Sequence, residues 1–185
     1  MATAIVSGLQ FVYPAVLVVL RRDPDAIRAG ELWRLVTALF VQPYGVAQCV
    51  ANAFLMLAFM PAAERLYGRG IVLLYFASGL VGQIANYWWV SGSGGSSTAA
   101  FGVMGGLLIY VIRNRKMVLL PFTFIAGGGL LAALFMISVR DGHGVGLLIG
   151  ASIASILPLT NMSFRSTSSA RERTGRSGSR PLVLR

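Results

Sequence analysis

The sequence predicts an all-α, polytopic membrane protein with six membrane-spanning helices. Hydrophobic residues make up 56% of the 185 residues and charged residues make up 12%, whereas a typical soluble domain carries about 25% charged residues. The mean hydropathy is +0.72. The few charges lie in clusters between long uncharged stretches, which excludes an ordinary soluble enzyme and a disordered chain and indicates helices that cross a bilayer.

Six apolar stretches approach the length of about 20 residues that a transmembrane helix needs. They cover residues 3–20, 46–63, 70–90, 97–112, 117–138 and 143–161. The first stretch is interpreted as a helix rather than a signal peptide, because no basic residue precedes it and no small-x-small cleavage site is evident. The connection between the first two stretches, 21–45, is long and partly apolar, while the later connections are short.

The distribution of Lys and Arg predicts the orientation of these helices in the membrane. One side carries eleven such residues, namely Arg65, Arg69, Arg113, Arg115, Lys116, Arg165, Arg171, Arg173, Arg176, Arg180 and Arg185. The other side carries five, namely Arg21, Arg22, Arg28, Arg34 and Arg140. Because the segments richer in Lys and Arg stay in the cytoplasm, we expect both termini to be cytoplasmic and the protein to lie in the plasma (inner) membrane.

The chain is expected to consist of two parts. Residues 1–162 form a six-helix membrane domain. Residues 163–185 are rich in Ser, Arg and Gly and have little to bury, which predicts a disordered basic cytoplasmic tail. Because the net charge of +10 lies mainly on the cytoplasmic side, the expected partner is the lipid bilayer and not a nucleic acid.

The residue inventory excludes several kinds of site. With one Cys, Cys49, and one His, His143, the chain has no internal disulfide and no set of nitrogen and sulfur ligands for zinc. None of the six acidic residues falls in the middle of an apolar stretch. A membrane aspartyl protease or a proton-coupled carrier would need such carboxylates. We therefore expect neither of these functions, and no metal or organic cofactor.

Four polar side chains are expected at a similar depth in the outer half of the bilayer. Gln48 and Asn52 are four residues apart and share one face of the second helix. Ser97 begins the fourth helix and His143 begins the sixth. Polar groups inside a membrane need partners or a cavity, so these four side chains predict a shared polar site.

This combination predicts acyl-transfer chemistry. The Ser97 hydroxyl becomes a good nucleophile when a base such as the His143 imidazole removes its proton, and the Asn52 and Gln48 amides can donate hydrogen bonds to an oxyanion. No acid is expected to complete a triad, because Asp141 is expected in the outer loop. Each feature also has a purely structural interpretation: Ser97 as part of a flexible connector, His143 as a helix cap, and the two amides as links between helices.

Small residues predict that the fourth and sixth helices cross closely. Gly102 and Gly106 form a small-xxx-small pair in the fourth helix, and Gly146 and Gly150 lie on the same face of the sixth helix as His143. The imidazole is therefore expected to point toward the fourth helix, which begins with Ser97.

Several separated motifs resemble those of the rhomboid intramembrane serine proteases. They are Gly30-Glu31-Leu32-Trp33-Arg34-Leu35-Val36-Thr37 in the first loop, Asn52, Glu64 and Gly68 in and after the second helix, Gly95-Ser96-Ser97-Thr98-Ala99-Ala100-Phe101-Gly102, and His143-Gly144-Val145-Gly146 with Gly150. The resemblance extends from about Gly30 to Ala154. It implies a six-transmembrane-helix rhomboid-like bundle.

The resemblance also implies a role for each site residue. In the family the nucleophile precedes an aromatic residue by four positions and a glycine by five, which matches Ser97 with Phe101 and Gly102 and does not match Ser96. Phe101 would pack against the His143 ring and orient it. Asn52, Gln48 and the Ser97 backbone N–H would hold the oxyanion. Two positions depart from the family pattern, since Thr98 replaces a glycine and Gln48 replaces a histidine.

Three functions are compatible with these features. The first is a serine endopeptidase that uses a Ser97–His143 dyad to cleave the transmembrane segments of membrane-protein substrates near the outer leaflet. The second, suggested by Thr98 and Gln48, is a catalytically inactive rhomboid-like protein that binds transmembrane helices. The third is a small channel or carrier that uses the polar outer cavity.

Overall fold

The computed structural model describes residues 2–90 and 93–160, and the regular elements within these residues are all α-helices. They are α1 (Ala2–Val12), α2 (Pro14–Leu20), α3 (Pro24–Arg28), α4 (Arg34–Thr37), α5 (Gly45–Tyr67), α6 (Gly70–Trp89), α7 (Ser97–Arg113), α8 (Leu120–Ser138) and α9 (Gly142–Ile156). The prediction of an all-helical fold is therefore confirmed for the described part of the chain. The predicted tail, 163–185, lies outside the described residues.

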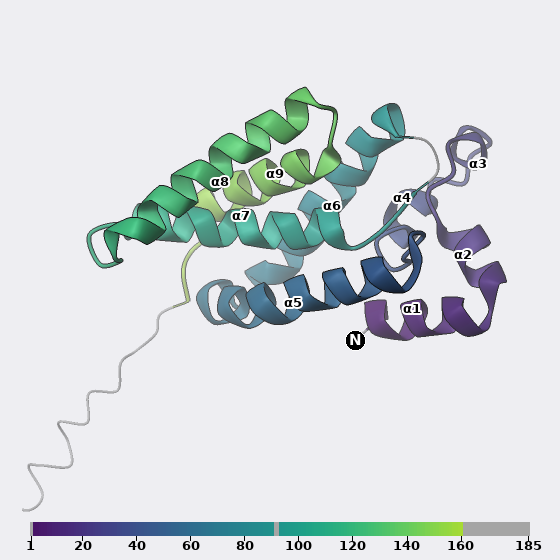
Figure 1. The fold of residues 1–185 in the computed structure, drawn as a ribbon, viewed down its shortest axis with the longest axis horizontal. Coiled ribbons are helices and arrows are strands. Elements are labelled where there is room, and N and C mark those ends of the chain that lie inside the picture. Colours follow the sequence, from purple (N-terminus) through teal and green to yellow (C-terminus); the bar gives the residue numbers. More distant parts are fainter. Residues whose placement is uncertain (1, 91–92, 161–185) are drawn as a thin grey trace, which may run out of the picture.

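The helices form a bundle in which α7 has a central position. It packs against α9, α6, α5 and α8, and Figure 1 shows α8 and α9 along one side of α7 and α5 along the other. Helices α1 and α2 and the short helices α3 and α4 gather at one end of the bundle.

The first predicted span is not one helix, and that prediction was wrong. The chain forms α1 and α2, which run in different directions in Figure 1. Tyr13, between them, has an extended backbone with φ −124° and ψ 90°. The cause is Pro14, because a proline disfavours helical geometry at the preceding residue and cannot donate a helical hydrogen bond. Pro14 instead begins α2, where its missing N–H has no cost.

The other five predicted spans correspond to α5, α6, α7, α8 and α9. Of these, α5, α6 and α8 are long and apolar enough to cross a membrane, with 23, 20 and 19 residues. Helices α7 and α9 are apolar but shorter, with 17 and 15 residues. Helix α9 ends at Ile156, before the predicted end at residue 161, because Pro158 favours the extended backbone seen at Leu157.

The outer surface of the bundle is strongly apolar. Large side chains of α5 and α8 point away from the core, among them Phe54, Leu57, Phe124 and Phe135. In water such a surface would cost a large free energy of hydration. It is the surface expected of a protein whose solvent is lipid.

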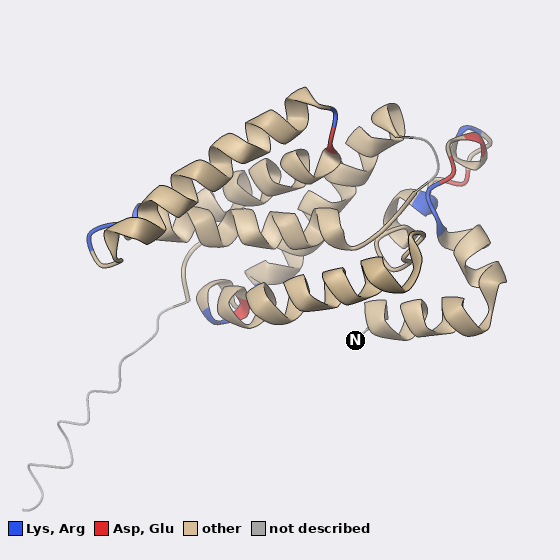
Figure 2. Cartoon of the chain, viewed as in Figure 1, with Lys and Arg blue, Asp and Glu red and all other residues tan. Residues whose placement is uncertain are grey.

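Charged residues of the described chain lie at the two ends of the bundle. Figure 2 shows Lys and Arg at the α7–α8 turn, and charges of both signs near the α5–α6 turn, at the α8–α9 turn and in the segment that contains α3. The long helices between these ends are almost free of charge. This distribution places an uncharged belt around the middle of the molecule, as a bilayer requires.

Candidate active site

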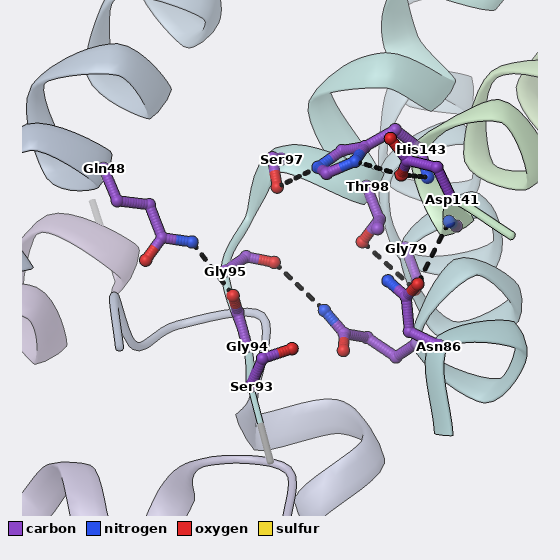
Figure 3. A network of polar contacts seen from close by, with 12 residues as sticks. Gln48, Gly79, Asn86, Ser93, Gly94, Gly95, Ser97, Thr98, Asp141 and His143 are labelled. Atoms are coloured by element: carbon purple, nitrogen blue, oxygen red, sulfur yellow. Dashed lines mark hydrogen bonds and ion pairs between the residues drawn. The ribbon is translucent and has the colours of Figure 1, made fainter. Parts of the chain in front are cut away.

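Ser97 and His143 meet where α7 and α9 begin. Ser97 is the first residue of α7, and its Oγ lies 2.7 Å from Nε2 of His143, the second residue of α9. Figure 3 shows the hydroxyl and the imidazole ring pointing toward one another. This distance is short enough for a proton to pass between the oxygen and the nitrogen.

The two helices bring these side chains together because their backbones cross in contact. A Cβ atom at Gly150 would collide with the carbonyl oxygen of Gly102, and one at Gly146 would collide with the carbonyl oxygen of Thr98. A larger residue at either position would push α9 away from α7. The glycines therefore determine the position of His143 relative to Ser97.

The glycines of this crossing differ in how closely they are packed. A Cβ at Gly106 would meet the flexible end of Leu74, at 3.2 Å, and would be in ordinary contact with the Cβ of Ala154 on α9, at 3.5 Å. A Cβ at its neighbour Gly105 would collide with the carbonyl oxygen of Leu147. The sequence analysis selected Gly106 from its spacing to Gly102, but the rotation of α7 turns Gly105 toward the backbone of α9.

The His143 ring has an aromatic neighbour. The ring centroids of Phe101 and His143 are 4.9 Å apart, with an interplanar angle of 52°. Phe101 lies one helical turn after Ser97, so its side chain covers the same face of α7. This contact restricts the rotation of the imidazole.

Asp141 corrects an expectation from the sequence. It lies in the turn between α8 and α9, as expected, but its side chain folds back as the N-cap of α9, and its Oδ1 accepts a hydrogen bond from the backbone N–H of His143 at 2.9 Å. The same oxygen lies 2.5 Å from Nδ1 of the His143 ring. Because a capping side chain folds back over the first turn of its helix, an aspartate two residues before a histidine can reach the ring.

A cavity of about 200 Å³ opens beside Ser97 and His143. Its lining residues are Tyr44, Gln48, Gln83, Asn86, Val90, Ser93, Gly94, Ser97, Thr98, Arg140, Asp141 and His143. Gln48 therefore faces the same space as Ser97. Its Nε2 donates to the carbonyl oxygen of Gly94 at 2.9 Å and its Oε1 accepts from the backbone N–H of Tyr44 at 3.0 Å.

Asn52 occupies a different position. It lines a second, mostly apolar cavity between α1, α5 and α6, and its Nδ2 donates to Oε1 of Gln42 at 2.7 Å. Gly95 lies between the two amides, since a Cβ there would be 3.6 Å from Asn52 Nδ2 and would collide with Gln48 Nε2. Gly95 also has φ +131°, so only glycine fits this position.

Thr98, which replaces the glycine of the family pattern, points away from Ser97. Its side chain is buried against α6, where its Oγ1 lies 3.5 Å from the carbonyl oxygen of Gly79. A Cβ at Gly82 would lie 2.9 Å from Thr98 Cβ, so the absence of a side chain at Gly82 makes room for the threonine. Figure 3 shows Thr98 and Ser97 on different sides of the first turn of α7.

Two polar residues that the sequence analysis did not select hold the segment before Ser97. The guanidinium of Arg22, which is fully buried, donates to Oε1 of Gln83, to Oγ of Ser93 at 2.6 Å and to the carbonyl oxygen of Val90 at 3.2 Å. Gln83 Nε2 in turn donates to the carbonyl oxygen of Gly95 at 3.1 Å. A glutamine in the middle of an apolar stretch was the available signal, because such a group needs a partner.

Burial also affects the charge of Arg22. Loss of water around its guanidinium lowers the pKa of Arg22 to about 10. The group is still cationic at neutral pH. Its positive charge is therefore retained beneath the segment that leads to Ser97.

No group of three or more His, Cys, Asp or Glu side chains that could hold a metal ion occurs in residues 2–90 and 93–160.

Comparison with known proteins identifies several relatives. Rhomboid protease GluP from Bacillus subtilis (strain 168) is 37% identical over 100 residues, which are 53% of this chain and 20% of GluP. YdcA from the same bacterium is 32% identical over 129 residues, which are 64% of this chain and 63% of YdcA. RHOMBOID-like protein 9, chloroplastic, from Arabidopsis thaliana is 30% identical over 96 residues, which are 51% of this chain and 22% of that protein.

These relatives are longer than the region that they share with this chain, which spans about a fifth of GluP, 63% of YdcA and about a fifth of the Arabidopsis protein. A family model extends further over the chain itself. The model described as the Rhomboid domain matches residues 29–159, from the end of α3 to beyond α9. Because this match covers most of the chain, including Ser97 and His143, the chain belongs to the rhomboid family of membrane proteins.

Proposed function

We propose that this protein is an intramembrane serine endopeptidase that cleaves the transmembrane segments of membrane proteins. The observation that carries the proposal is the distance of 2.7 Å between Ser97 Oγ and His143 Nε2. Membership of the rhomboid family and the similarity to Rhomboid protease GluP support the same activity.

In the proposed reaction Ser97 Oγ attacks the carbonyl carbon of the scissile peptide bond while His143 Nε2 takes the hydroxyl proton. The tetrahedral intermediate then loses the amine, which receives that proton from His143. Water attacks the resulting ester, with His143 again as the base, and releases the carboxylic acid and the free Ser97 hydroxyl.

The negative charge on the intermediate oxygen needs donors. Ser97 begins α7, and the first N–H groups of a helix have no partner within that helix and lie at its positive end. Gln48 and Asn52 each use one amide N–H in their present hydrogen bonds, to Gly94 and to Gln42, and each retains a second. We therefore propose that the Ser97 backbone N–H and the Gln48 amide donate hydrogen bonds to this oxygen. The Asn52 amide would support them from the second cavity.

The proposed topology has six membrane crossings, with α1 and α2 together forming the first. The segments rich in Lys and Arg would face the cytoplasm, together with both termini and the tail 163–185. Ser97 and His143 would then open toward the outer face of the plasma membrane. Substrate helices must unfold locally before cleavage, so residues such as Gly and Pro near the outer leaflet would favour cleavage.

Cleavage of a model transmembrane substrate in liposomes tests this proposal. We expect the full chain to cut the substrate, and Ser97→Ala to reduce the rate by about 10⁴-fold or more. Ser96→Ala is the matched control, because Ser96 is the adjacent serine but is buried with its Oγ 3.5 Å from Gln42 Nε2. This control is expected to remain active.

A fluorophosphonate probe gives an independent measurement. It should label the native protein and the Ser96→Ala variant, but not Ser97→Ala or His143→Ala. A folded native protein that neither cleaves nor reacts with the probe would contradict the proposal and would instead favour an inactive relative that binds transmembrane helices.

A further inference from the structure

We propose that Asp141 is a third member of this site, a positioning residue that holds the His143 ring in the tautomer required of a general base. The inference rests on the proposed protease function. It replaces a Ser–His dyad with a Ser97–His143–Asp141 arrangement in which Asp141 and His143 are two residues apart on the same helix end.

The geometry around Asp141 supports this role. One carboxylate oxygen, Oδ1, lies 2.5 Å from His143 Nδ1 and 2.9 Å from the His143 backbone nitrogen. On the opposite side of the ring, Nε2 lies 2.7 Å from Ser97 Oγ. The imidazole is therefore bonded at both nitrogens, and Figure 3 shows the carboxylate, the ring and the hydroxyl as one continuous chain of contacts.

The backbone on which the carboxylate sits is also held in place. The Asp141 N–H donates to the carbonyl oxygen of Met136 at 2.9 Å, and its carbonyl oxygen accepts from Gly144 at 3.2 Å. The next residue, Gly142, donates to Asn86 Oδ1 on α6 at 3.0 Å. Asp141 is thus tied to α8 and α9, and the adjoining residue is tied to α6, so the carboxylate is aimed at the ring by its surroundings.

The chemistry follows from what a carboxylate can do. An ionised aspartate only accepts hydrogen bonds, so the ring nitrogen beside it must carry the proton. With the proton on Nδ1, the lone pair of Nε2 faces the Ser97 hydroxyl and can take its proton. When the ring then becomes an imidazolium, the negative charge of Asp141 stabilises it.

The alternative explanation is that Asp141 serves only as a helix cap. Asp141→Asn separates the two roles, because asparagine is as good an N-cap as aspartate but carries no charge. Its amide can also donate to Nδ1 and so favour the wrong tautomer. A role limited to capping predicts an unchanged turnover rate for this variant.

The kinetic test measures the cleavage of the model substrate by the full chain. For Asp141→Asn we expect kcat to fall by about tenfold or more, with KM and the melting temperature close to those of the native protein. A kcat within about twofold of the native value would overturn the proposal. Asp23→Asn is the matched control, because Asp23 caps α3 through the backbone N–H groups of Asp25 and Ala26 and is remote in sequence from Ser97.

The spectroscopic test needs neither a substrate nor a variant. His143 is the single histidine of the chain, so ¹⁵N-histidine labelling and a histidine-free affinity tag give one assignable imidazole. With the ring neutral, we expect the proton on Nδ1 in the native protein and a shift toward Nε2 in Asp141→Asn. A native ring protonated mainly on Nε2 would overturn the proposal.

The two measurements also separate this inference from the function on which it rests. Absence of cleavage by the native protein would contradict the protease function. The tautomer of His143 would still report whether Asp141 positions the ring.

Discussion

Arg22 illustrates how a buried residue can hold the segment that leads to a candidate site residue, Ser97. Its guanidinium is buried beneath the segment 93–96 and contacts Gln83, Ser93 and the carbonyl of Val90. Its backbone N–H also donates to the carbonyl oxygen of Ser93 at 2.9 Å. In the sequence Arg22 counts only as one of several charges after the first apolar stretch, because nothing local reveals that this side chain is buried.

Replacement of Arg22 by methionine tests this role. Arg22→Met keeps most of the side-chain volume but leaves Gln83 and Ser93 without their buried donor, so we expect the free energy of unfolding to fall by about 1–3 kcal/mol. Cleavage should slow as well, because the backbone before Ser97 is no longer held. Thermal unfolding and the rate of fluorophosphonate labelling measure the two effects.

Arg28 provides the control for Arg22→Met. It lies in the same inter-helix segment, but its side chain is exposed and forms an ion pair with the exposed carboxylate of Asp25. Arg28→Met should therefore change neither stability nor labelling beyond experimental error. Equal effects of the two substitutions would show that loss of charge, and not loss of the buried contacts, is responsible.

At the scale of the elements, the crossing of α7 and α9 determines whether Ser97 and His143 meet. The sequence predicted this crossing from Gly102, Gly146 and Gly150, and a side chain at each of these positions would collide with a neighbouring helix. The sequence pattern indicated Gly106, and not Gly105, as the second glycine of the contact, because a spacing of four residues identifies a helix face only to within about one residue.

Gly150→Ala tests the crossing. The added methyl group would collide with the carbonyl oxygen of Gly102, which is backbone and cannot move away alone. We expect overpacking to lower the free energy of unfolding by about 1–3 kcal/mol and to separate Ser97 from His143. Labelling of Ser97 by the fluorophosphonate should fall more than the folded fraction of the protein.

Gly128→Ala on α8 is the matched control for this substitution. A Cβ at Gly128 would meet no atom within 4 Å. Alanine is also the better helix former, so this variant should be at least as stable as the native protein and fully labelled. Comparable losses in both variants would mean that the close α7–α9 contact is not what positions the site.

Pro14 is the element-scale feature that the hydropathy pattern concealed. Apolar residues continue on both sides of it, so the stretch 3–20 has the composition of one span. The proline nevertheless divides it into α1 and α2. Hydropathy measures the preference for lipid, whereas the continuity of a helix depends on backbone hydrogen bonds that proline cannot make.

At the scale of the whole molecule, the bundle has an apolar outer surface and a polar interior at one end. The helices long enough to cross a membrane include α5 and α8, whose large apolar side chains point outward. The orientation proposed from Lys and Arg would place the α8–α9 turn, with Arg140 and Asp141, outside the cell.

The two ends of α8 allow this orientation to be measured. Met117, before α8, and Val139, after it, are both exposed. In a Cys49→Ser background, we expect a membrane-impermeant maleimide to label Val139→Cys in intact cells and Met117→Cys only after lysis. The opposite pattern would reverse the proposed topology, and labelling of both in intact cells would contradict a membrane-spanning α8.

The sequence by itself determined the all-helical class and the family, and it predicted that Ser97 and His143 lie together, because hydropathy, residue type and motif spacing are all local properties of the chain. Only the tertiary structure decided that Asp141 reaches the imidazole, that Arg22 lies buried under the segment before Ser97, and that Thr98 fits against Gly82. These outcomes depend on how separate helices pack and how a cap folds back. A linear pattern does not contain either kind of contact.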